Sequence, residues 1–520
     1  MLASVQVSDI NPTGHAAVGE LVVLDDSIYF TATSAEGESG VYTTNGSTSS
    51  TRRVDNSTGA AFLQAIDDDI FFVGDGQLWK TDGSNVESLG EFDFRTDTLV
   101  NNRLLTIEDG NWQFTPLDET ATGFAIPAGG TFSHTLYLPT DSGELFLVSI
   151  GSDEAKIWIT DGTEEGTQLL DDLTGSSVGA AFVAGDRLGY TITTLDDDGG
   201  LTGELHFADS SSNEIVTNFE RAEEVAFPII SSSPLPRFED KAFFFRGEET
   251  WQTDGTPEGT RLFSEERVFP VWSEGDVTYF LDTQPSPAGS DLWRTDGSFD
   301  DAVLLANVVN PERPIEHNGN LLFTDIDGLI WSTDGSPEGT EVLANFTGQY
   351  IGESVFNAAE MVVVDGSLFY SGSSNDITSK EQPGAELFRL TLDPRWNNPF
   401  DGGDVNDDGQ VSPLDALLII NELNDRQFVD ETGLINSDPV LNLQLDANSD
   451  GFISPVDALS VINELQSTSP QPTTSPQVDA DLSDEQLTGY VAELAADEDN
   501  VEDTEDQYAN LADIVFGEYD

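Results

Sequence analysis

The sequence predicts a mainly β protein in which a single β-propeller of about seven to nine four-stranded blades precedes a small α-helical domain and an acidic tail. Three observations support this order. A phrase containing an Asp-Gly pair recurs through residues 1–395. Two acidic twelve-residue segments, each followed by a helical pattern, occupy residues 398–467. A Pro/Ser/Thr linker at 468–479 and an acidic tail at 480–520 follow them.

The recurring phrase is best preserved as W-S-T-D-G-S-P-E-G-T at Trp331–Thr340. Asp-Gly and Asn-Gly pairs are strong hairpin signals, because Gly adopts positive φ without steric cost. Each copy therefore predicts a turn between two antiparallel strands, with the aromatic residue near the end of the first. The other copies are Tyr42–Ser47, Trp79–Ser84, Trp158–Thr167, Trp251–Thr260 and Trp293–Ser298.

The spacing of the aromatic residues predicts about nine units, each close to the roughly 40–50 residues of a four-stranded blade. The third and fifth units are degenerate, with Trp112–Thr115 and His206–Asp209 in place of the phrase. Because propellers commonly have about four to eight blades, we expect one of the nine units to fall short of a full blade. The predicted strands preceding the aromatic strands are Ser27–Thr31, Asp69–Val73, Arg103–Ile107, Thr135–Leu138, Arg187–Ile192, Lys241–Phe245, Val277–Leu281, Asn320–Thr324 and Ser367–Tyr370.

The two ends of the repeat region are complementary. Val5–Pro12 is similar to the strand that follows a turn phrase, as at Leu304–Pro311. The last unit, Glu386–Leu392, has the aromatic strand but leaves the repeat immediately afterwards. We therefore expect the N-terminal segment to complete the last blade and close the ring.

These repeats resemble the ELWxxDGT repeat family, whose phrase occurs here as D-L-W-R-T-D-G-S at Asp291–Ser298. The resemblance spans roughly residues 5–392. It implies a propeller-like domain found in bacterial exported proteins, and it implies no settled activity.

The acidic segments Asp404–Asp415 and Asp446–Asp457 have the pattern of calcium-binding loops. Each places oxygen-bearing side chains at positions 1, 3, 5 and 9, a Gly at position 6 and an Asp at position 12. Calcium takes about six to eight oxygen ligands, and a Gly at position 6 permits the sharp turn around the ion. We predict two Ca²⁺ sites; a pair of metal-free acidic turns is the alternative. The predicted ligands are Asp404, Asn406, Asp408, the carbonyl of Gln410, Ser412 and Asp415, and Asp446, Asn448, Asp450, the carbonyl of Phe452, Ser454 and Asp457.

Each loop leads directly into an amphipathic helix, at Asp415–Leu423 and Asp457–Leu465. A loop followed by a helix, twice over, resembles a type I dockerin, which implies docking onto a cohesin module. Family members commonly use hydroxyl residues at loop positions 10 and 11, where this chain has Pro413-Leu414 and Pro455-Val456. The S-P-[LV]-D-A-L form is similar to planctomycete dockerin-type repeats. This departure leaves calcium binding intact and puts an ordinary cohesin partner in question.

Composition limits the partners. There are 97 Asp and Glu residues against 19 Lys and Arg, a net charge of −78, which disfavours nucleic acids and anionic lipids. There is no Cys, no run of about 18 apolar residues that would span a membrane and no visible signal peptide. We expect the Pro/Ser/Thr linker to be extended and the tail to be largely disordered.

Several residue sets have competing interpretations. The Asp of each turn phrase binds a cation or caps the turn, and capping is favoured. The repeated Trp residues stack on sugars or pack between blades, and packing is favoured. Asp67–Asp69 and Asp196–Gly200 are further calcium loops or, more simply, acidic hairpin tips. The four His residues, His15, His134, His206 and His317, form no metal-ligand pair in the sequence, and no catalytic residue is nominated.

We therefore expect a non-catalytic, secreted or cell-surface interaction protein with calcium-dependent docking. The alternatives are a carbohydrate-active enzyme, a glycoside hydrolase or polysaccharide lyase acting through the propeller, and a carbohydrate-binding lectin. The expected partners are a cohesin-like or other protein module and, in the alternatives, a polysaccharide. We expect calcium to order the helical module and to leave the propeller unaffected.

Overall fold

The computed structural model describes residues 5–468 except at a few single or paired positions and in eleven longer gaps. These gaps lie at 12–15, 55–58, 94–96, 118–121, 128–131, 196–200, 220–224, 227–240, 283–288, 346–360 and 373–385. The predicted linker beyond residue 468 and the predicted tail at 480–520 lie outside the described residues.

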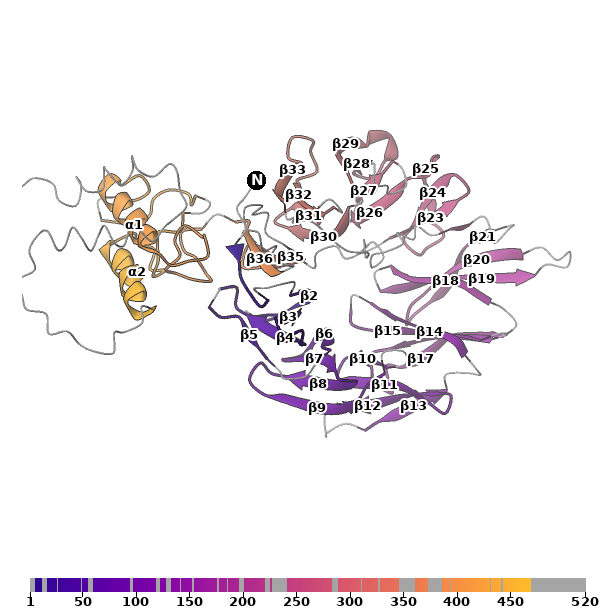
Figure 1. Cartoon of the computed structure of the whole chain (residues 1–520). Coiled ribbons are helices and arrows are strands. Elements are labelled where there is room, and N and C mark those ends of the chain that lie inside the picture. Colours follow the sequence, from indigo (N-terminus) through magenta and orange to yellow (C-terminus); the bar gives the residue numbers. More distant parts are fainter. Residues whose placement is uncertain are drawn as a thin grey trace, which may run out of the picture. The chain divides into compact units, whose positions relative to one another are not determined.

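The propeller consists of nine antiparallel sheets of four strands each, arranged around a ring (Figure 1). Blade 1 contains β2 (Gly19–Leu24), β3 (Ser27–Thr33), β4 (Ser39–Thr44) and β5 (Arg52–Arg53). Blade 2 contains β6 (Ala61–Ile66), β7 (Asp69–Gly74), β8 (Gln77–Thr81) and β9 (Val86–Glu91). Blade 3 contains β10 (Thr98–Val100), β11 (Arg103–Glu108), β12 (Asn111–Pro116) and β13 (Phe124–Pro127).

The chain continues around the ring in the same order of strands. Blade 4 contains β14 (Phe132–Pro139), β15 (Leu145–Gly151), β16 (Glu154–Thr160) and β17 (Gln168–Thr174). Blade 5 contains β18 (Ser177–Ala184), β19 (Arg187–Leu195), β20 (Leu201–Ala208) and β21 (Asn213–Phe219). Blade 6 contains β22 (Val225–Ala226), β23 (Ala242–Arg246), β24 (Glu249–Thr253) and β25 (Arg261–Ser264).

The last three blades bring the chain back to its start. Blade 7 contains β26 (Phe269–Glu274), β27 (Val277–Leu281), β28 (Ser290–Thr295) and β29 (Val303–Val308), with a 3-10 turn at Phe299–Asp301. Blade 8 contains β30 (Glu312–His317), β31 (Asn320–Thr324), β32 (Leu329–Thr333) and β33 (Glu341–Asn345). Blade 9 contains β34 (Met361–Val364), β35 (Ser367–Gly372), β36 (Glu386–Thr391) and the N-terminal β1 (Val5–Gln6).

The blade count confirms the prediction of seven to nine, and all nine repeat units form full blades. The expectation that one unit would fall short is therefore wrong. Eight of the nine predicted preceding strands are second strands of their blades. The exception is Thr135–Leu138, which belongs to the first strand of blade 4; the second strand there, Leu145–Gly151, was not predicted.

Ring closure by the N-terminus is confirmed. β1 pairs antiparallel with β36, with Val5 opposite Arg389, and the Val7 N–H then donates to the Leu387 carbonyl at 2.8 Å. Val7, fully buried, and Leu387 belong to one apolar cluster that also contains Phe30 of blade 1. The N-terminal strand thus completes the last blade, and a shared core joins this blade to the first.

The carboxylate of Glu386, which is almost completely buried, reinforces this closure. It accepts hydrogen bonds from the Ser8 hydroxyl at 3.2 Å and from the backbone N–H groups of Ile10 and Asn11, both at 3.1 Å. All three donors lie just after β1. One side chain of the last blade therefore fixes the course of the N-terminal segment.

Second strands such as β7, β23, β27 and β31 are buried on both faces, as their non-alternating sequences suggest. In β23, Phe244 packs toward blade 5 and its neighbour Phe243 packs toward blade 7. Third-strand aromatics stack on second-strand aromatics across the pair. Phe323 and Trp331 of blade 8, for example, have ring centroids 6.1 Å apart and planes inclined by 2°.

The helical module has its own core. Helices α1 (Pro413–Asp425) and α2 (Pro455–Thr468) bury Ile419 and Val461 against Val405, Leu445 and Ile453. The helices begin two residues before the predicted starts, because a Pro is well suited to the first helical position. No helix of the described residues is long and apolar enough to cross a membrane.

We predict that Glu386→Ala destabilises the propeller by about 2–3 kcal/mol at neutral pH, because two backbone N–H groups lose their acceptor. Ser8→Ala, which removes only the hydroxyl donor, is the matched control and should cost about 1 kcal/mol. Denaturant unfolding of both variants measures the difference. A Glu386→Ala protein as stable as the parent would contradict this role.

The contribution of Glu386 should also depend on pH. Burial raises the pKa of this carboxyl above its ordinary value of 4.5, despite the hydrogen bonds that lower it. A carboxyl with a raised folded-state pKa contributes most below its unfolded pKa, and this contribution declines as the pH rises through the folded value. The difference in unfolding free energy between the parent and Glu386→Ala should therefore be larger near pH 4.5 than at neutral pH. A difference that grows toward neutral pH contradicts the prediction.

Candidate calcium loops and repeated turns

The two predicted calcium loops have the same backbone hydrogen bonding at position 1. In the first loop, the Asp404 carboxylate accepts from the N–H groups of positions 5 and 6, at 3.1 and 2.9 Å. In the second, Asp446 accepts from the equivalent groups at 3.0 and 2.9 Å. The Gly at position 6 has φ of 87° at Gly409 and 84° at Gly451, the left-handed conformation that the loop pattern requires.

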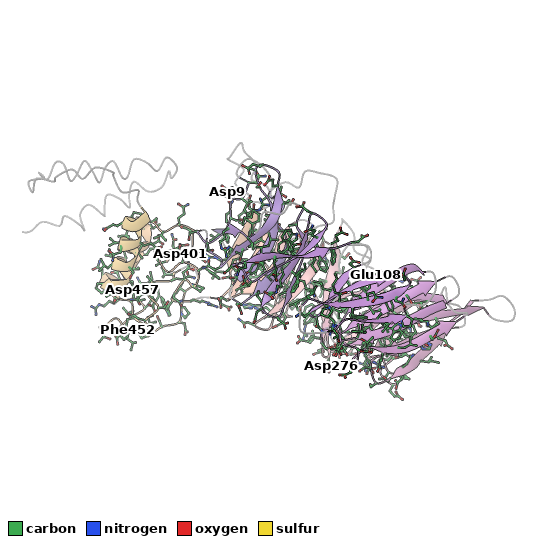
Figure 2. The ribbon with its side chains drawn as sticks, turned by 90° about the horizontal axis from the view of Figure 1, so that it is seen from below. Asp9, Glu108, Asp276, Asp401, Phe452 and Asp457 are labelled. Atoms are coloured by element: carbon green, nitrogen blue, oxygen red, sulfur yellow. The ribbon has the colours of Figure 1, made fainter. Side chains whose placement is uncertain are left out.

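Position 12 closes each loop on the opposite side. Asp415 accepts from the N–H of position 3 at 3.2 Å and from that of Ser412 at 2.8 Å. Asp457 accepts from the same two positions at 3.2 and 2.8 Å, the second donor being Ser454. Figure 2 labels Asp457 at the start of α2. The Asp at position 12 thus ties the end of each loop to its beginning.

The other predicted ligands lie within the same turns. Asn406 and Asn448, at position 3, each accept from the N–H of position 5, at 3.1 and 3.0 Å. The carboxylates at position 5 accept from the N–H groups of Gln410 and Phe452, at 3.0 and 2.9 Å. Gln410 and Phe452 contact the loops here through their backbone N–H groups; that their carbonyls are calcium ligands stays a prediction.

Ser412 has a second role that accounts for the helix start. Its hydroxyl accepts from the Leu414 N–H at 3.2 Å, and the N–H and hydroxyl of Ser412 both donate to Asp415, which completes a capping box. Ser454 repeats the contacts with Val456 and Asp457. The residue at position 9 is therefore a helix cap as well as a predicted ligand.

Four carboxylates of the loops are buried close to other negative charge. Asp404, Asp415, Asp446 and Asp457 are each at most 5% exposed. Burial, with the charges of Asp407 and Asp408, raises the pKa of Asp404 to about 7 despite its hydrogen bonds. Burial also raises the pKa of Asp415 and Asp446. In the described part of the chain, none of the four forms an ion pair with Lys or Arg.

This donor set fits a hard divalent cation. Carboxylate, amide and hydroxyl oxygens are the ligands that calcium prefers, and a cation would offset the repulsion among buried carboxylates. Within the described residues, no three His, Asp or Glu side chains already have the spacing of metal ligands. The loops hold their oxygen atoms in the predicted order, with the carboxylates directed at backbone N–H groups.

The repeated turn phrase forms one hydrogen-bond network in its three full copies. In blade 6 the Asp254 carboxylate accepts from the N–H and hydroxyl of Thr256, at 2.9 and 2.7 Å. The Thr253 and Thr260 hydroxyls meet at 2.7 Å across the turn. A Cβ at position 259 would lie 2.0 Å from the Asp254 carboxylate, so a residue with a side chain would clash there and Gly fits. Blades 4 and 8 repeat this network at Asp161 and Asp334.

The phrase residues therefore have structural roles, in agreement with the favoured interpretation. The degenerate unit of blade 5 keeps the turn cap, because Asp209 accepts from the N–H groups of Ser211 and Ser212 at 2.7 and 2.8 Å. The phrase Trp residues pack in the cores between blades; Trp79, for example, lies with Tyr29 of blade 1. This position leaves no support for sugar stacking by Trp79.

Of the two further acidic segments, one is described. Asp67–Asp69 forms the tip between β6 and β7, where Asp67 has φ of 53° and Asp69 pairs with Lys80 at 3.2 Å. Asp196–Gly200 lies outside the described residues. Exposed acidic side chains also occur elsewhere on the propeller, including Asp9, Glu108 and Asp276 (Figure 2).

Sequence reasoning did not find the contact between the helical module and the propeller. Arg389 of β36, 2% exposed, pairs with the Asp407 carboxylate of the first loop, which also accepts from the Thr391 hydroxyl. Phe400 of the module lies under the Arg389 guanidinium, at 4.5 Å, and edge-on to Phe369 at 5.4 Å. No local sequence pattern indicates these pairs.

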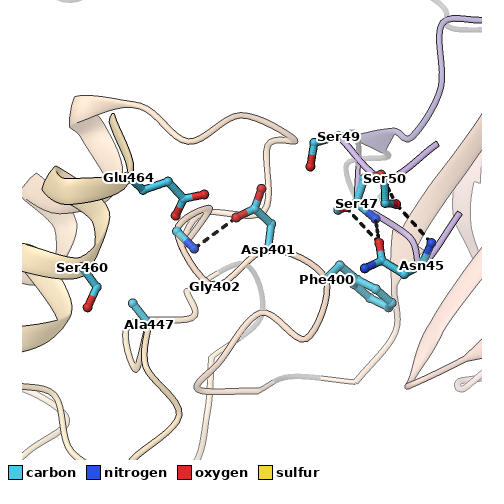
Figure 3. A pocket seen from close by; sticks show the side chains of 11 residues that line it. Asn45, Ser47, Ser49, Ser50, Phe400, Asp401, Gly402, Ala447, Ser460 and Glu464 are labelled. Carbon is cyan, nitrogen blue, oxygen red and sulfur yellow. Dashed lines mark hydrogen bonds between the residues drawn. The ribbon is translucent and has the colours of Figure 1, made fainter. Parts of the chain in front are cut away.

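A polar hollow of about 430 Å³ lies beside this contact (Figure 3). Asn45, Ser47 and Ser50 line it from the turn of blade 1, where Asn45 accepts from the Ser47 N–H and hydroxyl. Asp401 and Glu464 line it from the module. Burial and the charge of Asp401 raise the pKa of Glu464.

Comparison with known proteins assigns the helical module. Residues 402–481 match the family profile of the Dockerin type I domain, whose members bind Ca²⁺ and cohesin modules. No curated protein matches the chain. The structure thus contains a type I dockerin domain after a nine-bladed propeller.

Similar solved structures are distant. The computationally designed Ika8 protein is 11% identical, with a TM-score of 0.38, over 74% of this chain and 99% of that chain. BamB from Moraxella catarrhalis is 11% identical, with a TM-score of 0.35, over 75% and 96%. Oligogalacturonate lyase from Vibrio parahaemolyticus is 8% identical, with a TM-score of 0.34, over 75% and 91%. Similarity at this level carries no information about activity.

We predict that Asp254→Ala lowers the unfolding free energy of the propeller by about 1 kcal/mol, because the turn loses its cap. Calcium uptake, measured by calorimetry, should not change. Glu258→Ala, in the same turn, is the matched control and should leave both quantities unchanged. Loss of one bound ion in Asp254→Ala would instead favour the cation-binding interpretation of the phrase.

Proposed function

We propose that this chain is an extracellular or cell-surface adaptor whose dockerin domain binds two calcium ions and then docks onto a cohesin-type module. The observation that supports it best is the matched pair of loops, in which the Asp residues at positions 1 and 12 accept from the same backbone N–H groups at positions 5, 6, 3 and 9 in both copies. Two unrelated acidic turns would not be expected to share these hydrogen bonds over twelve residues.

In this proposal, the side chains of Asp404, Asn406, Asp408, Ser412 and Asp415 hold the first ion together with the Gln410 carbonyl. Asp446, Asn448, Asp450, Ser454 and Asp457 hold the second together with the Phe452 carbonyl. The ion supplies the positive charge that buried loop carboxylates lack. With a core of two helices and no disulfide, the module gains part of its folding free energy from the metal.

The docking surface differs from the hydroxyl-bearing one that the resemblance implies. Leu414 and Val456, at position 11 of the two loops, are 49% and 56% exposed, and Leu459 of α2 is 53% exposed. Exposed apolar side chains at the start of both helices favour a partner with an apolar face. We therefore infer a cohesin-type module whose contact site is less polar than usual.

The propeller serves in this proposal as a non-catalytic domain. Within the described residues, His206 pairs with Glu204 at 3.0 Å and His317 pairs with Asp393 at 3.1 Å. The Asn318 side chain also contacts His317 and donates to Asp393, at 3.2 and 3.1 Å. A screen of polysaccharides for binding and for release of reducing sugars separates the adaptor from the enzyme and lectin alternatives. Reproducible turnover would replace the adaptor proposal with the enzyme.

We predict that calorimetry detects two calcium ions per chain. Asp408→Ala and Asp450→Ala should each remove one ion, because each deletes a loop carboxylate. Asp438→Ala, an exposed change outside both loops, is the control and should keep two. The double variant should lose helical circular dichroism as EGTA does. A parent that takes up no calcium contradicts the proposal.

We also predict that at least one module in a panel of purified cohesins binds the chain in calcium and not in EGTA. Val456→Asp should weaken this binding at least tenfold, about 1.4 kcal/mol, because it places a charge in an apolar contact. Val440→Asp, at a residue that is also exposed (42%) but lies outside the helices, is the control. If no cohesin in the panel binds the calcium-loaded chain, the partner is of another class.

A further inference from the structure

The two calcium loops have the same internal geometry but different surroundings. Position 4 is Asp407 in the first loop and Ser449 in the second, with φ of 56° and 60°. Asp407 is 6% exposed, whereas Ser449 is exposed. In the first loop, Asp407 contacts the propeller through Arg389 and Thr391 of β36.

The receiving surface on the propeller is built for this contact. Arg389 also donates to the Gly46 carbonyl of the blade 1 turn, at 3.2 Å. Gly46 has φ of 96°, and a Cβ there would lie 2.5 Å from the Phe400 ring and 2.8 Å from Phe369. Phe400 in turn belongs to the apolar cluster at the junction of blades 9 and 1. The propeller and the module up to Leu465 accordingly form one compact unit.

We propose that calcium binding at the first loop is coupled to ring closure of the propeller, so that the two calcium sites are unequal. The inference rests on the proposed calcium binding. It replaces the expectation that calcium leaves the propeller unaffected.

The coupling follows from the position of Asp407 in the chain. Its neighbours at positions 3 and 5, Asn406 and Asp408, are predicted ligands. The contact with Arg389 and Thr391 holds the left-handed backbone at Asp407 between them. If the contact between Asp407 and the propeller favours the conformation of the first loop that binds calcium, it raises the calcium affinity of this loop. By thermodynamic linkage, bound calcium then raises the equilibrium constant for the Asp407 contact by the same factor. Among the described residues, no side chain of the propeller forms a hydrogen bond or ion pair with Ser449 of the second loop.

The same contact connects calcium to the ring. β36 carries Arg389, Thr391 and Glu386, and it pairs with the N-terminal β1. A bound ion that stabilises the Asp407 contact should therefore reduce local opening of β36. Hydrogen exchange of the amides at 386–391 measures this opening without any substitution.

The experiment measures the calcium affinity of each loop separately in the full chain. Asp446→Ala with Asp450→Ala isolates the first loop, and Asp404→Ala with Asp408→Ala isolates the second. In the first background, Asp407→Ser should weaken calcium binding about tenfold, toward the affinity of the second loop. Ser occupies the equivalent position 449 of the second loop with a similar φ, so we expect the loop backbone to tolerate Ser at position 407. Ser449→Ala in the second background is the matched control and should change nothing.

Thr391→Val and the hydrogen-exchange measurement test the coupling independently, in case the Asp407→Ser chain does not fold. Thr391→Val removes one hydroxyl donor to Asp407 and should weaken the first site by a smaller factor. In the unsubstituted chain, calcium should slow exchange at 386–391. Equal affinities in parent and Asp407→Ser chains, or exchange at 386–391 unaffected by calcium, overturn the coupling while the two-site proposal stands. Absence of calcium uptake in both backgrounds overturns both.

Discussion

The junction between the last and first blades is the constraint on which the rest of the structure depends. An open arc of sheets would leave an unpaired strand edge, and only closure of the ring removes it. Here β1 supplies the missing strand, and the buried Glu386 carboxylate holds the segment that follows it. The same strand, β36, presents Arg389 to the turn of blade 1 and to the dockerin domain. The same strand, β36, therefore closes the ring and attaches the module.

Arg residues also stabilise contacts between neighbouring blades. With 97 acidic residues and only 19 Lys and Arg, cations are scarce, and several are placed where one blade meets the next. Arg52 and Arg187 each donate to the carbonyl of the turn Gly in the following blade, at 2.7 Å, as Arg389 does at the closure. Protein cations thus organise the contacts between blades. In the calcium loops, Asp407 has such a partner in Arg389. Asp404, Asp415, Asp446 and Asp457 are buried without one among the described residues, and we expect these carboxylates to depend most on ions from solution.

Local patterns in the sequence predicted the turns, the helices and the loops because each is determined by residues within one short segment. The Asp of the turn phrase accepts from an N–H group two positions away, and the ligand residues of the loops accept from N–H groups two to ten positions away. The Glu386 contacts join residues 375 or more positions apart, and no periodicity marks them. Position 4 of the loop pattern specifies no ligand, and Asp407 and Ser449 differ there. The role of Asp407 could not be predicted from the loop sequence, because it depends on Arg389 of the propeller. Blade 4 was misassigned because Thr135–Leu138 has the β-rich composition of a second strand.

A crystal structure of the full chain grown with calcium, with anomalous scattering used to locate the ions, tests this account most directly. The account predicts two ions, each about 2.4 Å from the carboxylates of one loop, with Asp407 still paired with Arg389. Ions found at the turn-phrase carboxylates instead, or none in the loops, would contradict it.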